Sequence, residues 1–105
     1  MKFNKSNIEL NSKKFNVIEI LDNEIGLVNM QDLKDIVNKE LEDGNIFIGI
    51  DMKNVNVINS SGLGVLISCL TKTKSRKGSL KLMNLNEKIL NIFKITKLNL
   101  VFDIS

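Results

Sequence analysis

The chain has no histidine, proline, tryptophan or tyrosine, and it has a single cysteine, Cys69. Without histidine, it cannot build a catalytic triad or dyad that needs an imidazole base. One cysteine excludes a disulfide within the chain and, with no histidine, the usual zinc sites. We therefore expect no metal and no cofactor. Cys69 falls on the apolar face of an expected helix, where a thiol is usually buried and unreactive.

The aromatic residues are five phenylalanines, and the net charge is +3 from mixed signs. A nucleic-acid surface more often has clustered arginines and stacking aromatic side chains, so we expect no direct nucleic-acid partner. No apolar stretch is long enough to cross a bilayer, and no N-terminal run resembles a signal peptide. These absences predict a cytoplasmic protein with no membrane partner.

The length of 105 residues and the hydrophobic content of 43% suit a single domain over residues 1–105. Strands are expected at residues 3–10, 15–21, 46–52, 79–85 and 98–104, and helices at residues 30–41, 63–77 and 87–95. Strands and helices therefore alternate after Phe15. This order predicts an α/β fold with a largely parallel sheet and crossover connections.

Proline is absent, so helix boundaries must come from other residues. Asn29 and Asn86 stand where helix N-caps are expected. Gly44 and Gly78 stand where helices are expected to end. The segment 46–52, which is almost entirely apolar, is typical of a central strand that is buried on both faces.

The stretch VINSSGLGVL, residues 57–66, lies at a strand-to-helix junction. Ligands and partners of open α/β sheets bind at such junctions, beyond the carboxyl ends of the strands. Asn59, Ser60 and Ser61 can each cap the following helix through a side-chain oxygen. Gly62 and Gly64 remove side chains where the backbone turns tightly or another surface approaches closely.

Four chemical alternatives fail at this motif. The phosphate-binding loop needs a Lys-Ser/Thr pair, and the dinucleotide fingerprint needs a third glycine at the right spacing. Asp51 lacks the preceding acidic pair of a receiver-type phosphoacceptor. The G-x-S-x-G elbow of a hydrolase is absent, and no base accompanies either serine.

Two interpretations of the serines remain: they belong only to a helix cap, or one of them accepts a phosphate from a kinase. The added charge of about −1.5 to −2 would be favourable at a helix N-terminus. A partner docked on the same surface would have to bury or repel it. Phosphorylation would then control binding rather than folding.

At this point the sequence resembles a known family. DMKNVNVINSSGLGVL, residues 51–66, is similar to the signature of STAS domains, which are named for sulfate transporters and anti-sigma factor antagonists. ILDNEIG, residues 20–26, stands where that family has a Gly-Glu-Leu-Asp-type turn. Residues 85–104 resemble its third helix and last strand. The resemblance implies a small α/β domain with a mixed sheet and helices packed on it.

In the stand-alone bacterial members, the first serine of the pair accepts phosphate from a serine kinase that is also the anti-sigma factor. The resemblance thus implies Ser60 as phosphoacceptor, with Ser61 as the alternative. It also implies that the unphosphorylated chain, which is not an enzyme, binds the kinase and frees a sigma factor for transcription, and that a serine phosphatase resets the switch. The implied partner contacts are Glu24, Asn59, Ser60, Ser61, Gly62 and Leu63.

The sequence departs from the family pattern at three places. Asn59 replaces an acidic residue before the serines, and Gly26 replaces the aspartate of the turn, although Glu24 remains. The chain stops at Ser105, without the family's closing helix, and an apolar face left open there would favour a partner or a homodimer. The departures support an alternative function, a STAS scaffold subunit of a sensory or lipid-transport complex that is not phosphorylated. A nucleotide-binding or hydrolytic domain is a third hypothesis.

Overall fold

The computed structural model describes all residues from Met1 to Ser105. The strands are β1 (Phe3–Leu10), β2 (Lys13–Ile20), β3 (Glu24–Ile25), β4 (Phe47–Asp51), β5 (Val57–Ile58), β6 (Ser79–Met83) and β7 (Asp103–Ile104). The helices are α1 (Met30–Glu42), α2 (Ser60–Ser75), α3 (Glu87–Ile95) and a short 3-10 helix, η1 (Leu98–Leu100).

Five strands form the main sheet in the order β1-β2-β4-β6-β7. β1 pairs antiparallel with β2, and the other neighbours pair parallel. The expected mixed, largely parallel sheet is therefore confirmed. β4 has a parallel partner on each side, and its Ile48 and Ile50 side chains are fully buried, as the apolar run predicted.

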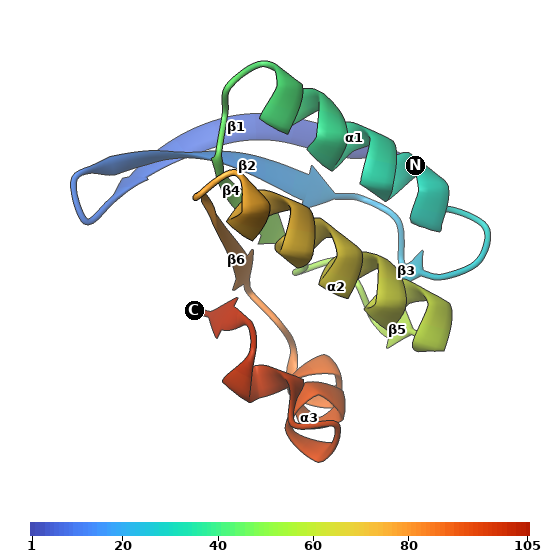
Figure 1. The fold of residues 1–105 in the computed structure, drawn as a ribbon. Coiled ribbons are helices and arrows are strands. Elements are labelled where there is room, and N and C mark those ends of the chain that lie inside the picture. The colour runs from blue at the N-terminus through green and yellow to red at the C-terminus, as the bar shows by residue number, and fades with distance from the viewer.

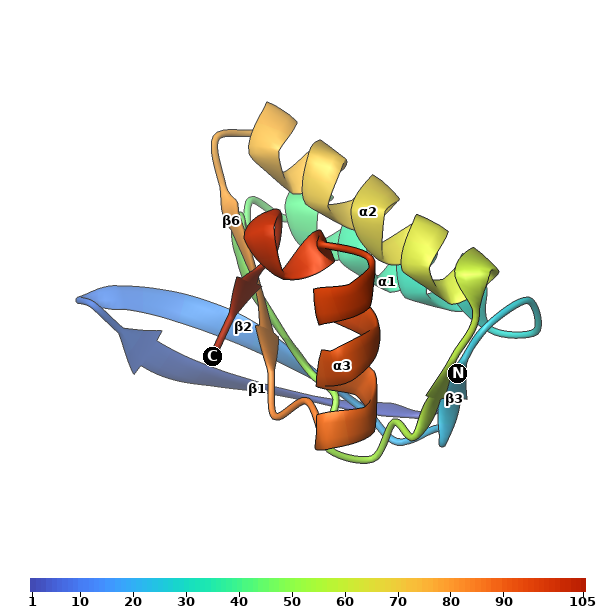
Figure 2. The ribbon, with the colours of Figure 1, turned by 90° about the horizontal axis from the view of Figure 1, so that it is seen from below.

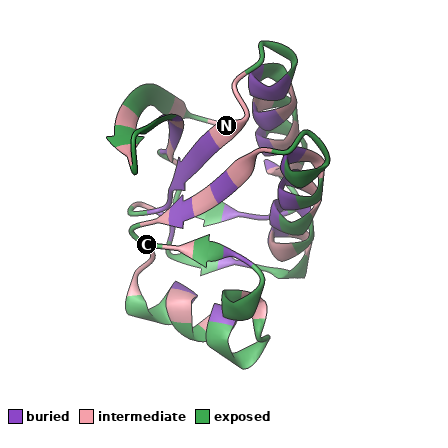
Figure 3. Ribbon diagram, turned by 60° about the vertical axis from the view of Figure 1, so that its left-hand side comes forward, coloured by how far each residue is buried: buried purple, intermediate pink, exposed green.

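Helices α1 and α2 lie side by side across one face of the sheet (Figure 1). The chain leaves β6 toward α3 and returns through η1, which contacts α3 and β7 (Figure 2). The buried residues gather on the strands and on the sheet-facing sides of the helices (Figure 3). They form one hydrophobic cluster to which all three α-helices contribute.

The helix ends agree only in part with the sequence predictions. Gly44 follows α1 with a φ of +86°, as expected of a glycine after a helix end. α2 ends at Ser75, slightly before the predicted end at about Lys77, and the left-handed residue after it is Lys77 rather than Gly78. Glycine is required at position 78 for a steric reason, because a Cβ there would lie 2.1 Å from the carbonyl oxygen of Ile46.

The expected strand at residues 98–104 is also largely wrong. Lys97 has a φ of 61°, and η1 follows it, so only β7 pairs with β6. Phe102 turns into the core, where its ring meets that of Phe93 edge-on at 5.5 Å. Burial of this aromatic side chain therefore prevails over the strand-forming pattern of the segment.

Candidate functional site

The candidate site is built where two distant segments meet beyond the main sheet. β3 follows β2, β5 follows β4, and the two short strands pair parallel with each other (Figure 1). Ile25 lies opposite Ile58 in this pairing, and both are buried. Glu24, which is exposed, and Gly26 are thereby brought next to the start of α2.

Asn59 is the N-cap of α2. Its Oδ1 accepts a hydrogen bond from the backbone N–H of Gly62 at 2.9 Å, and its carbonyl accepts one from Leu63. Of the three residues that the sequence left open as caps, the structure thus assigns Asn59. Capping by Asn59 also explains why α2 begins at Ser60 rather than at the predicted residue 63.

The two serines occupy the first two positions of α2, and they differ in exposure. Ser60 is exposed, whereas Ser61 is half-buried and lines a groove between α1 and α2 with Met30 and Lys34. Neither serine hydroxyl forms a hydrogen bond within the chain, and the ammonium group of Lys34 does not hydrogen-bond to Ser61. Ser60 is therefore the more accessible hydroxyl, and no base is aligned on either.

The two glycines of the motif have different physical roles. A Cβ at Gly62 would lie 2.3 Å from the carbonyl oxygen of Ile25 and 2.9 Å from Cγ1 of Ile58. The absence of a side chain there lets α2 pack directly on β3 and β5. A Cβ at Gly64 would meet nothing within 4 Å, so packing within the chain does not require glycine at this exposed position.

Asn29 occupies the N-cap position of α1, as predicted, but its side chain makes no capping bond, so that part of the prediction was wrong. Its Oδ1 instead accepts from the N–H of Gly26 at 2.9 Å, and its Nδ2 donates to the carbonyl of Glu24 at 2.7 Å and to Asp22 at 2.9 Å. Asn29 is buried, and it stabilises the turn before α1 from within.

That turn presents two apolar side chains that the sequence analysis missed. Leu27 is 71% exposed and Val28 is 93% exposed, next to the start of α2. Together with Glu24, Gly26 and Asn59 they line a small cavity of about 120 Å³. Two consecutive apolar residues before a helix suggest burial, so only the Gly26–Asn29 turn could have indicated that they project outward.

Asp22 anchors the same turn. The carboxylate of Asp22 accepts hydrogen bonds from the side chain of Asn29 and from the backbone N–H of Lys2. These bonds, of which the one from Asn29 has the larger effect, hold the pKa of Asp22 below its ordinary value of 3.8. A carboxylate whose pKa is lower in the folded state stabilises the fold above its unfolded pKa, and that stabilisation is lost as the pH falls through the folded pKa.

We therefore expect Asp22→Asn to lose less stability than the wild type between about pH 5 and about pH 2, because this carboxylate no longer has to be protonated. Urea unfolding followed by circular dichroism across that range measures the effect. Glu9→Gln, which changes an exposed carboxyl on β1, is the matched control. Identical pH profiles for Asp22→Asn and the wild type would contradict this assignment.

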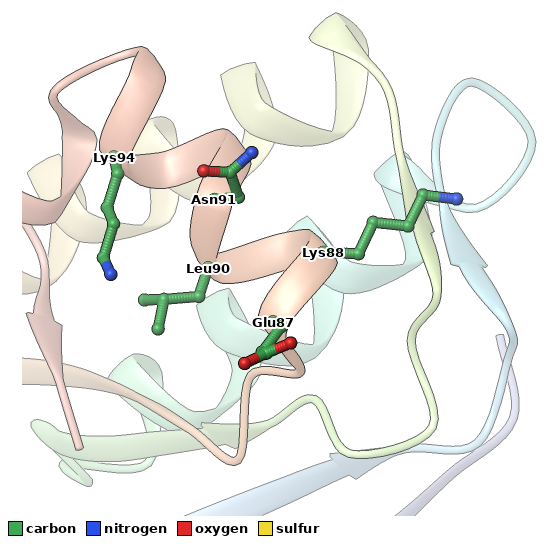
Figure 4. A pocket seen from close by; sticks show the side chains of 5 residues that line it. All are labelled: Glu87, Lys88, Leu90, Asn91 and Lys94. Carbon is green, nitrogen blue, oxygen red and sulfur yellow. The ribbon is translucent and has the colours of Figure 1, made fainter.

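No other pocket or polar residue brings functional side chains together as the start of α2 does. The pocket of largest volume, about 540 Å³, lies over α3, where Lys88 and Lys94 point in different directions (Figure 4). Asp51 is buried, and its carboxylate accepts a hydrogen bond from the backbone N–H of Lys53 at 3.1 Å.

Burial raises the pKa of the Cys69 thiol to about 11, which agrees with the unreactive thiol that we expected. None of the helices is both long and apolar enough to span a bilayer.

The arrangement defines a class: a small mixed α/β domain with a serine pair at the first turn of a capped helix. The chain belongs to the STAS domain family, whose model matches residues 7–105. The anti-sigma-B factor antagonist of Bacillus subtilis (strain 168) is 43% identical over 56 residues, which are 53% of this chain and 51% of that protein. The matched segment thus spans about half of this relative.

Solved structures share the fold at lower identity. An anti-sigma factor antagonist from Mycobacterium paratuberculosis superposes with a TM-score of 0.77 at 17% identity, covering 99% of this chain and 86% of its own. The phosphorylated form of the Bacillus cell fate determinant SpoIIAA superposes with a TM-score of 0.68 at 15% identity, covering 99% and 91%. At these identities the likeness establishes the fold.

Proposed function

We propose that this chain is an anti-sigma factor antagonist, a non-enzymatic cytoplasmic binding protein that forms a single domain and is switched off by phosphorylation of Ser60. The observation that carries the proposal is an exposed, unpaired Ser60 hydroxyl at the first position of α2. The family membership and the partial identity to the Bacillus subtilis antagonist support it.

The geometry suits such a switch. Asn59 already satisfies the N–H of Gly62, so a phosphate on Ser60 leaves the cap intact. The first turn of α2 contains no acidic residue, and the helix N-terminus therefore accepts the new charge without repulsion from within that turn. The unmodified surface, with Leu27 and Val28 beside Asn59, the residue before Ser60, offers apolar contacts to the anti-sigma factor. A dianion in that interface opposes docking.

The test is phosphate transfer. The protein is incubated with ATP and a serine-kinase anti-sigma factor from its own organism, and Ser60→Ala and Ser61→Ala are compared with the wild type. We expect Ser60→Ala to abolish labelling and Ser61→Ala to retain it, and we expect a serine phosphatase to remove the label. If the wild type takes no phosphate, or if only Ser61→Ala abolishes labelling, the assignment of Ser60 is wrong.

Gly64 provides a separate prediction about the docking surface. A glycine inside an exposed helix costs about 0.5–1 kcal/mol relative to alanine, and nothing in the chain requires it here. We expect Gly64→Ala to stabilise the fold by that amount and to weaken binding of the anti-sigma factor, because an added methyl group obstructs close approach. Thermal unfolding and titration calorimetry measure the two effects. A more stable variant with unchanged affinity would exclude Gly64 from the interface.

A further inference from the structure

The two departures from the family pattern near Ser60 lie far apart in the sequence but meet in the structure. A Cβ at Gly26 would lie 2.8 Å from Nδ2 of Asn59, 3.2 Å from its Cγ and 3.3 Å from its Oδ1. The amide of Asn59 therefore occupies the space that a side chain at position 26 would need. Gly26 and Asn59 form one structural unit.

The orientation of this amide follows from its other contact. Oδ1 must face the N–H of Gly62, which donates to it at 2.9 Å, so Nδ2 lies toward Gly26. Nδ2 donates to no group of the chain, and Asn59 is exposed. A free amide donor is thus held beside Ser60 by the helix cap.

The surroundings of this donor are rigid and carry little charge. Gly26 is tied to Asn29 through its N–H, and Asn29 is in turn bonded to Glu24 and Asp22. The small cavity over Gly26 is lined by one ionisable residue, Glu24, and by the apolar Leu27 and Val28. A partner group that enters it meets a hydrogen-bond donor rather than the acidic side chains that the family pattern has at positions 26 and 59.

We propose that Gly26 and Asn59 act as a specificity-determining pair, which selects an anti-sigma factor that offers a hydrogen-bond acceptor to this corner and disfavours one that offers a cation. This inference rests on the proposed function. A cation brought against the neutral amide finds no counter-charge at positions 26 and 59 and has only Glu24 nearby, whereas a carbonyl oxygen pairs with Nδ2. Specificity then comes from both the favourable and the unfavourable contact.

The first arm of the test needs no partner. Gly26→Ala, Asn59→Ser and the double variant are compared by urea unfolding. Serine still caps α2 but has no amide over position 26, so the added methyl group has room. We expect Gly26→Ala to lower the unfolding midpoint in the wild type, and to lower it by less than half as much in the Asn59→Ser background. If Gly26→Ala lowers the unfolding midpoint equally in both backgrounds, the two positions are not coupled, and the proposal that they act as a pair is overturned.

The second arm measures selectivity with the anti-sigma-B factor of Bacillus subtilis as the probe, because its antagonist belongs to a family with an acidic residue at position 59. We expect Asn59→Asp to raise the affinity for this probe at least about fivefold. Asn91→Asp, which adds the same charge on the outer face of α3, should change it less than about twofold. No gain with Asn59→Asp, or an equal gain with Asn91→Asp, would overturn the proposal.

The two proposals fail in different experiments. Absence of phosphate transfer to the wild-type chain removes the function proposed for Ser60, whereas the unfolding comparison of Gly26 and Asn59 is unaffected by it. A wild-type chain that is labelled on Ser60, combined with no selectivity effect of Asn59→Asp, removes only the specificity pair.

Discussion

Replacing Gly62 by alanine is expected to lower the free energy of unfolding by about 3 kcal/mol. The new Cβ would lie 2.3 Å from the carbonyl oxygen of Ile25, a backbone atom that cannot rotate away. Either α2 moves off the small sheet of β3 and β5, or those strands separate. Both movements displace Ser60 from the surface formed with Glu24, so partner binding should fall with stability. Urea unfolding followed by circular dichroism measures the first effect.

Gly64→Ala is the matched control for this prediction, because it adds the same methyl group to the same helix two residues later. Nothing lies within 4 Å of a Cβ at Gly64, and the fold should become more stable. If Gly62→Ala and Gly64→Ala change the unfolding midpoint in the same direction, then Gly62 is not a close-approach glycine. That result would contradict the conclusion that α2 packs directly on β3 and β5 through Gly62.

Replacing Ser60 by aspartate is expected to weaken binding of the anti-sigma factor at least about tenfold, which corresponds to about 1.4 kcal/mol. The carboxylate imitates part of the charge of a phosphate at the centre of the proposed docking surface. The fold should be as stable as the wild type or more stable by about 0.3–1 kcal/mol, because the charge lies at the N-terminus of α2. Titration calorimetry, together with thermal unfolding, separates loss of binding from loss of structure.

Ser60→Ala serves as the control, since it removes the hydroxyl without adding charge and should bind nearly as the wild type does. Binding of a partner that is insensitive to Ser60→Asp would contradict the switch. That outcome would favour the scaffold subunit, in which the same surface docks constitutively.

Much of the fold could be predicted because it depends on local patterns. The alternation of apolar strands and amphipathic helices implied a parallel sheet, and the uniformly apolar segment around Ile48 and Ile50 implied its central strand. Asn86 caps α3 through a bond from the N–H of Ile89, a contact between residues three apart. Such contacts can be inferred from spacing alone because both partners lie in the same turn of the chain.

The predictions that failed depended on contacts between distant segments. Asn29 has the right residue type and place for a cap, yet the turn at Gly26 and the carboxylate of Asp22 use its side chain. Residues 98–104 have strand-forming composition, yet the side chain of Phe102 is buried in the core and only Asp103–Ile104 form a strand. In each case a buried tertiary contact prevails over a local preference that is worth less.

The sequence by itself therefore determined the fold class, the family resemblance and the segment that holds the candidate site, because these follow from composition, periodicity and one motif. Only the tertiary structure decided which residue caps α2, which motif glycine is sterically required, and that Gly26 lies against Asn59. The last two of these facts depend on where β3 lies relative to β5 and α2. That position is set by packing between segments that are far apart in the chain.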